Sequence, residues 1–454
     1  MTLDYTLLQW LLVIGSSLAL FWIAPNAKSV NDFFKGSRKD RSPNFWLLTS
    51  SLVISWLFAK SITNAANLGL SFGIVGGLAY AAYYLSFVVA GIVIYQLRSK
   101  GGFKSIHHFL ETKYGFGAIA LFSLLIGIRL FNEVWSNTIV IGSYFGEVGT
   151  KPYYSAILVF TFLTLAYSIK GGMSSSILTD LIQMVLFGLI LVVLLVIIIP
   201  KTDGGAMRYV KTGVWSWGMG LNLLWVAIIQ SLSYPFHDPV MTDRGFIADK
   251  TTTLRSFIAA FGIGAICILL FSFIGIYGQL EGVEGQAAVG VAKLLGVPMM
   301  LLINFIMITS AASTLDSTFS SFSKLIHLDL KKEGNPSLSG GRKSMIIITI
   351  LGTIPVFLKP EILTATTVSG TMVIGLAPVF LFWFLDAPKF SFYGAVGAGL
   401  GMGVVVALGL YPTSWHFTGG KYADLLSANI IGSLACFFMF FIPYFMTKMK
   451  TSAN

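Results

Sequence analysis

The chain has 454 residues, of which 55% are hydrophobic and only 11% are charged, and its mean hydropathy is +0.80. This composition excludes a water-soluble globular protein with an ordinary charged surface. Long apolar runs recur along the chain at the length of a membrane-spanning helix, about 20 residues, without the alternation typical of membrane β-strands. The sequence therefore predicts an all-α integral membrane protein.

About thirteen transmembrane helices are predicted. In chain order they cover residues 3–24, 44–70, 72–97, 116–145, 153–169, 176–199, 217–239, 254–279, 290–325, 342–358, 361–385, 390–410 and 422–447. An odd number of spans places the two termini on opposite sides. The loops of one side hold 21 Lys and Arg residues and those of the other side hold seven, so the positive-inside rule predicts an outside N-terminus and a cytoplasmic C-terminus.

The net charge of +11 does not indicate a nucleic-acid partner, because the basic residues are scattered over many short loops beside the lipid headgroups. The first span lacks the basic start of a cleavable signal peptide and is expected to be retained. We expect a multi-pass protein of the cell membrane, a bacterial inner membrane, that functions as a monomer. Cys267 and Cys436 lie in apolar runs and are expected to be packing residues.

No loop is long enough for a soluble catalytic domain, so no enzymatic activity and no catalytic residue are expected. Two spans are instead interrupted by polar residues, in SWLFAKSITNAAN (residues 55–67) and in QSLSYPFHDP (residues 230–239). They lie five helices apart. Broken helices at corresponding positions of two five-helix halves are typical of inverted-repeat transporters with a binding site at the bilayer midplane.

Hydroxyl side chains gather at the end of the ninth predicted span, in SAASTLDSTFSSFS (residues 310–323). Ser310, Ser313, Thr314 and Ser317 recur at the spacing of one helix face. Such hydroxyls can bond to their own helix or mediate close helix packing. Together with carbonyls freed by a helix break, they can also supply the oxygen ligands that a dehydrated sodium ion needs.

Three segments resemble signatures of the sodium:solute symporter family, and they occur in the family's order. KGGMSSSILTDLIQ (170–183) resembles the GG…TD-x-x-Q signature of the fifth core helix, FHDPVMTDRGFIADK (236–250) is similar to the D-Q-x-x-x-Q-R segment after the sixth, and SAASTLDS (310–317) resembles the eighth. Pro239 and Asp243 replace the two glutamines of the second segment, which puts the inner-loop role of those positions in doubt.

The resemblance implies a LeuT-type fold, in which ten core helices form two inverted five-helix repeats with broken first and sixth core helices. It divides the chain into an extra N-terminal helix with a basic inner loop (1–43), a first repeat (44–215), a second repeat (216–388) and two C-terminal helices with a tail (389–454).

The resemblance also implies a sodium site. Ser313 and Thr314 would be the side-chain ligands, with Ser310 beside them, and the carbonyls of Trp56 and Ala59 in the broken first core helix would complete it.

The resemblance also implies a second sodium site. Asp180 matches an aspartate of those family members that bind two sodium ions, and the hydroxyls of Ser310, Ser313 and Thr314 would complete the site. The alternative is that Asp180 pairs with a Lys or Arg near the inner interface.

For the substrate, the resemblance points to residues beside the two breaks, with Tyr234 as the inner gate. These residues are Lys60, Thr63, Ser231 and Tyr234. Lys60 departs from the family pattern, and a buried lysine in a membrane span is costly unless it has a function or a partner. It could bind an anionic group of the substrate, pair with Glu133 or another internal acid, or act as a tethered cation or proton carrier.

Arg129 and Glu133 are further candidates for substrate binding, although their i, i+4 spacing also predicts that they pair with each other. The sequence as a whole predicts a symporter that uses one or two Na⁺ ions to import a small organic solute by alternating access. Lys60 favours a carboxylate-bearing solute, an amino acid or an organic acid. The alternatives are a proton-coupled carrier of the same fold, a transporter for urea or another small polar solute and, least favoured, a solute sensor.

Overall fold

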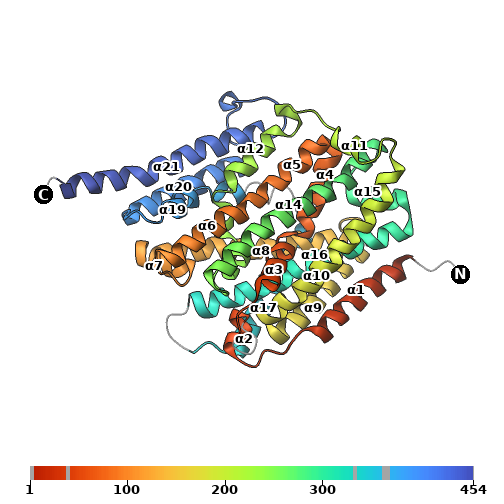
Figure 1. Ribbon diagram of the computed structural model, residues 1–454, viewed down its shortest axis with the longest axis horizontal. Helices are drawn as coiled ribbons and strands as arrows, with labels where there is room; N and C mark the ends of the chain where they lie inside the picture. The colour runs from red at the N-terminus through yellow and green to blue at the C-terminus, as the bar shows by residue number, and fades with distance from the viewer. Residues whose placement is uncertain (1–4, 37–40, 331–334, 360–368, 453–454) are drawn as a thin grey trace.

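The computed structural model describes residues 5–36, 41–330, 335–359 and 369–452. Within these ranges the chain forms helices and connecting turns and contains no β-strand, which confirms the all-α prediction. Figure 1 shows long helices lying roughly side by side, with the N-terminus and the C-terminus at opposite ends of the molecule.

The helices before the second break are α1 (Tyr5–Ile23), α2 (Val30–Lys35), α3 (Phe45–Trp56), α4 (Ala59–Phe72), α5 (Ile74–Ala81), α6 (Leu85–Ser99), α7 (Ile106–Tyr114), α8 (Phe116–Gly142), α9 (Lys151–Gly171), α10 (Met173–Ile198), α11 (Gly205–Val210) and α12 (Leu221–Gln230). Those after it are α13 (Pro239–Arg244), α14 (Lys250–Leu280), α15 (Ala287–Leu295), α16 (Val297–Lys324), α17 (Leu338–Thr353), α19 (Leu376–Leu381), α20 (Lys389–Ala407) and α21 (Ala423–Ser452).

Ten helical segments of the described chain are long and apolar enough to cross a membrane, and the bent pair α3–α4 makes eleven. Each of these coincides with a predicted span. The two other predicted spans behave differently: the longest helix within residues 217–239 is the short apolar helix α12, and residues 361–385 lie partly outside the described residues. The count of thirteen therefore stays a prediction.

Both predicted helix breaks are present. Helix α3 ends at Trp56, Leu57 leaves the helical conformation, and α4 continues at an angle of 60°. Helix α12 ends at Gln230, and a short 3₁₀ turn with Pro235 leads to Asp238, whose carboxylate accepts the Met241 N–H and caps α13. A proline lacks the N–H that a continuous helix would need, so the second break follows directly from the sequence.

The ninth predicted span, residues 290–325, is corrected by the structure. It is divided into α15 and α16 at Gly296, which has a φ of 86°. Glycine adopts this left-handed conformation without a steric penalty, and Pro298 in the first turn of α16 favours a new helix start.

The broken helix pair α3–α4 lies in the middle of the molecule (Figure 1). Helix α14 packs along both halves, and α10, α16 and α8 cover other sides. The approach of α14 to α4 is so close that a Cβ atom on Gly275 would lie 1.7 Å from the Ala66 carbonyl oxygen. The break therefore lies among α14, α10, α16 and α8, and the candidate site is there.

Candidate sodium and substrate site

The hydroxyl face of α16 meets the break between α3 and α4. The Ser310 hydroxyl donates to the Leu57 carbonyl oxygen, and the Ser313 hydroxyl donates to Asp180 Oδ1 over 2.5 Å. Thr314 Oγ1 donates back to the Ser310 carbonyl over 3.0 Å, as in ordinary helix packing. Two of the three predicted hydroxyls thus reach oxygens on other helices.

The carbonyls around the break have hydrogen-bond partners. The Trp56 carbonyl accepts the Tyr84 hydroxyl over 3.0 Å, and the Ala59 carbonyl accepts the Thr63 hydroxyl over 2.9 Å. Leu57, which sequence reasoning did not select, supplies the carbonyl nearest to the hydroxyl face. Along the chain it lies between the two residues whose carbonyls were predicted as ligands, Trp56 and Ala59.

Asp180 on α10 is fully buried and has a cationic partner. Arg244 at the end of α13 donates to Asp180 Oδ2 over 3.1 Å, and Ser51 donates to the same oxygen over 2.5 Å. Arg244 also donates to the Ser317 hydroxyl over 2.8 Å. The pairing with an arginine, which was the alternative for Asp180, is thus the arrangement observed.

A second carboxylate, Asp316, lies one turn from Ser313 and was not selected from the sequence. It accepts hydrogen bonds from Tyr167 (2.9 Å), Ser176 (2.8 Å) and Thr179 (3.0 Å). No ion pair with a lysine or arginine of the described residues involves it. Asp180, Asp316 and Arg244 therefore carry two negative charges and one positive charge when all are ionised. Asp316 belongs to the segment SAASTLDS, and its position among the four hydroxyl residues of that segment is the sequence signal that could have identified it.

Lys60 lies in a second buried group, the charge quartet, formed by Lys60, Arg129, Glu133 and Asp238. Lys60 Nζ lies 2.8 Å from Glu133 Oε1, and Arg129 contacts both Glu133 and Asp238, the latter over 3.2 Å. Trp56 Nε1 also donates to Asp238 over 2.9 Å. Both pairings predicted as alternatives, Lys60 with Glu133 and Arg129 with Glu133, are thus observed. Asp238 was missed as a partner.

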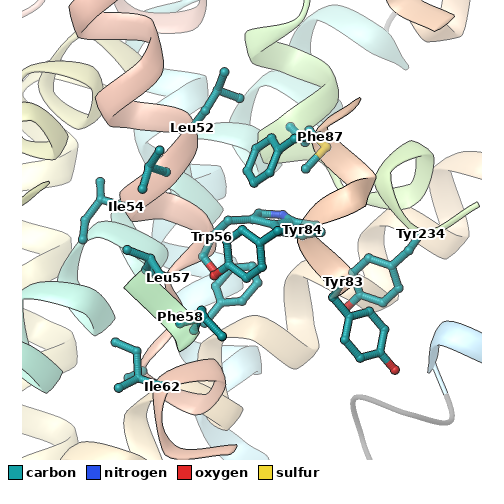
Figure 2. Close-up of a cluster of buried hydrophobic side chains, with 14 of the residues drawn as sticks. Leu52, Ile54, Trp56, Leu57, Phe58, Ile62, Tyr83, Tyr84, Phe87 and Tyr234 are labelled. Atoms are coloured by element: carbon teal, nitrogen blue, oxygen red, sulfur yellow. The ribbon is translucent and has the colours of Figure 1, made fainter. Parts of the chain in front are cut away.

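Aromatic rings cover the charge quartet at the first break. Figure 2 shows Trp56 and Tyr84 next to each other, with Phe58 below them and Tyr83 and Tyr234 at one side. The Arg129 guanidinium lies 5.1 Å from the centre of the Tyr234 ring and 5.5 Å from that of Phe58. A cavity of only about 20 Å³ lies between these rings and Lys60, which is room for about one water molecule.

Two predicted substrate residues lie apart from this group. The Ser231 hydroxyl donates to the Ile228 carbonyl over 2.7 Å. Thr63 lines a different and larger cavity of about 480 Å³, together with Asn64, Asn67, Lys359 and Lys421. The structure therefore brings Lys60, Arg129, Glu133 and Tyr234 together and leaves Thr63 and Ser231 outside the group.

No family model matches the sequence. A sodium/glucose cotransporter of Vibrio parahaemolyticus is 25% identical over 209 residues, which cover 42% of this chain and 36% of the cotransporter. Sodium/glucose cotransporter 1 of Mus musculus is 26% identical over 165 residues, which cover 35% of this chain and 24% of the cotransporter. The chain thus spans about a third or less of the length of the curated relatives it matches.

Solved structures match over nearly the whole chain. The substrate-bound outward-open state of a Na⁺-coupled sialic acid symporter superposes with a TM-score of 0.73 at 16% identity, covering 96% of this chain and 97% of that one. Mhp1, a nucleobase-cation-symport-1 family transporter, matches in a closed conformation with bromovinylhydantoin bound, with a TM-score of 0.57, 14% identity and coverage of 94% and 95%. These similarities confirm the LeuT-type fold, and together with the sequence matches they confirm that the chain resembles the sodium:solute symporters, which are transporters and not enzymes.

Proposed function

We propose that the protein is a sodium-coupled secondary active symporter that imports a small organic solute by alternating access. The observation that carries this proposal is the contact between the hydroxyl face of α16 and the break in α3–α4, at Ser310 and the Leu57 carbonyl. The negative end of the α3 dipole and its freed carbonyls favour a cation at this place. The relatives named as sodium cotransporters and the Na⁺-coupled symporter of the same fold support it.

The proposed sodium ligands are the hydroxyls of Ser313 and Thr314 and the carbonyls of Trp56 and Ala59, with Ser310 beside them. When sodium binds, these hydroxyls would turn their hydrogens away and offer lone pairs to the ion. Sodium then stabilises the arrangement in which α16 and the broken helix are close, and a ligand can shift a conformational equilibrium only by such differential affinity.

A second sodium ion would have to compete with Arg244 for Asp180. Its site would use Asp180 with Ser310, Ser313 and Thr314, but Arg244 already neutralises this carboxylate. Both charges are buried, and two cations on one carboxylate repel each other. A second ion therefore requires a state in which the bond between Arg244 and Asp180 is broken.

The proposed solute bears a carboxylate and binds beside the breaks, at Lys60 and Arg129, with Tyr234 as the inner gate. Two observations support this location. Lys60 lines the small aromatic cavity, and Arg129 lies over the ring of Tyr234. Because that cavity has almost no free volume, solute entry must move the rings, as expected for an occluding gate.

The test compares the detergent-solubilised protein in sodium and in choline buffer. A solute should raise the melting temperature in sodium only, because ligands that bind the folded state stabilise it. Ser313→Ala should raise the sodium concentration for half-maximal stabilisation about 10- to 100-fold, the effect of losing one buried polar ligand. Thr309→Val is the matched control on the same helix, since the Thr309 hydroxyl bonds back to Phe305. Equal stabilisation in both buffers would contradict sodium coupling.

A further inference from the structure

The charge quartet is electrically balanced. Lys60 and Arg129 contribute two positive charges, and Glu133 and Asp238 contribute two negative ones. All four side chains are buried, and each cation contacts at least one carboxylate. A buried charge is costly without a partner, so any solute that enters the quartet must leave this balance intact.

The neighbouring sodium site is a separate group of charges. Arg244 balances Asp180, and Asp316, which lacks a cationic partner among the described residues, adds a negative charge only when it is ionised. A sodium ion on the adjacent hydroxyl face lies against this second group. Within the quartet itself, a monoanionic solute would add a negative charge that none of its four side chains compensates.

A zwitterion leaves the charge of the quartet balanced. Its carboxylate can replace Glu133 as the partner of Lys60, and its ammonium group can replace Lys60 as the partner of Glu133. The pair Lys60–Glu133, with 2.8 Å between Nζ and Oε1, is then opened by the solute without any change in net charge. A neutral solute brings no charge that could replace either partner of that ion pair, so opening the pair for it would leave two buried charges unpaired.

We propose that the transported solute is a zwitterion, an α-amino acid or a related inner salt, bound between Lys60 and Glu133 with its apolar part against Trp56 and Tyr234. The proposal rests on the proposed symporter function and narrows its substrate class. It excludes simple carboxylic acids, which the proposed function alone would allow, and it assigns Glu133 as the residue that selects against them.

The experiment uses ligand sets that differ only in charge: an amino acid, the corresponding 2-hydroxy acid and the amino acid amide. Alanine, lactate and alaninamide form one set, and phenylalanine, phenyllactate and phenylalaninamide form another. Binding is measured by thermal shift of the full chain in sodium and in choline. In sodium we expect stabilisation by an amino acid, with the matched hydroxy acid and amide bound at least tenfold more weakly.

Two variants test which residues select the charge. Glu133→Gln gives the quartet a net positive charge. The ratio of the dissociation constants of the amino acid and of the hydroxy acid should then change by at least tenfold in favour of the hydroxy acid. Lys60→Met should move the preference toward the amide instead. Glu147→Gln, a matched change at the exposed Glu147, should leave both ratios unchanged. If a variant does not fold, the wild-type ligand sets decide alone.

Each outcome separates the two proposals. Sodium-dependent binding of the hydroxy acid, the amide or glucose in preference to every amino acid would overturn the zwitterion proposal and leave the symporter intact. An amino acid that binds equally well in choline would support the zwitterion and overturn sodium coupling. Failure of all amino acids to bind, or no change in the ratios in a folded Glu133→Gln protein, would also overturn the proposal.

Discussion

Replacing Arg244 by glutamine should destabilise the protein strongly. The guanidinium donates to Asp180 over 3.1 Å, to Ser51 over 2.5 Å and to Ser317 over 2.8 Å, and all of these side chains are buried. The substitution leaves Asp180 ionised without a cation in the interior. Removing one partner of a buried ion pair costs about 3–5 kcal/mol, because the remaining charge is not compensated.

The same variant tests the second sodium site. If sodium can take the place of the guanidinium at Asp180, the loss of stability in Arg244→Gln relative to the wild type should be smaller in sodium than in choline. At a concentration 100 times its dissociation constant, sodium would restore about 2.7 kcal/mol. The Asp180→Asn, Arg244→Gln double variant removes both charges of this ion pair, so it should cost less than the sum of the single changes by about 1–3 kcal/mol and should gain no more stability from sodium than the wild type does.

The assay is the melting temperature of the four proteins in detergent, measured in sodium and in choline. A folded Arg244→Gln protein that melts like the wild type would refute the ion-pair reasoning, and so would strictly additive effects in the double variant. A large loss without sodium rescue would keep the ion pair but reject a second sodium ion at Asp180.

Three further changes have definite expected outcomes. Gly275→Ala places a methyl group 1.7 Å from the Ala66 carbonyl and should lower the melting temperature through an overpacking cost of about 1–3 kcal/mol or more, whereas Gly262→Ala on the same helix meets nothing within 4 Å and should have little effect. Asp249 caps α14, and hydrogen bonds from Thr252 lower the pKa of this carboxyl. Asp249→Ala should therefore cost about 0.5–2 kcal/mol at neutral pH, and because the folded-state pKa is depressed, the difference from wild type in melting scans should shrink as the pH falls below about 4. Lys324→Met removes the partner of both Asp243 and Asp329 and should lower the melting temperature more than Lys113→Met, because the partner of Lys113 is Asp386, whose side chain is 95% exposed.

Local patterns were sufficient to predict the broken helices and the hydroxyl face. Pro235 interrupts a helix by its own chemistry, and the spacing of Ser310 and Ser313 places their side chains on one face wherever the helix lies. Their meeting with the first break is also what the family resemblance implied. These features depend on neighbours within one or two helical turns, which is why a single sequence contains them.

The partners of the buried charges could not be chosen from the sequence. Asp180 and Arg244 are 64 residues apart, and Lys60 and Glu133 are 73 residues apart, so only the packing of the helices decides which of them meet. Leu57 was missed for another reason. Its contribution is a backbone carbonyl, which every residue has, and its side chain gives no signal that the helix ends there.

Four of the buried ion pairs share one structural feature: they join a broken span to a continuous helix. Lys60 joins α4 to α8, Asp238 joins the start of α13 to α8, Arg244 joins α13 to α10, and Asp243 joins α13 to α16. Movement of the broken spans must open some of these pairs, and in a medium without water an opened pair is costly. An ion or a charged solute that binds between a broken span and a continuous helix supplies a replacement partner for the charges of an opened pair. The energetic coupling of cation and solute to movement therefore follows from where these charges are placed.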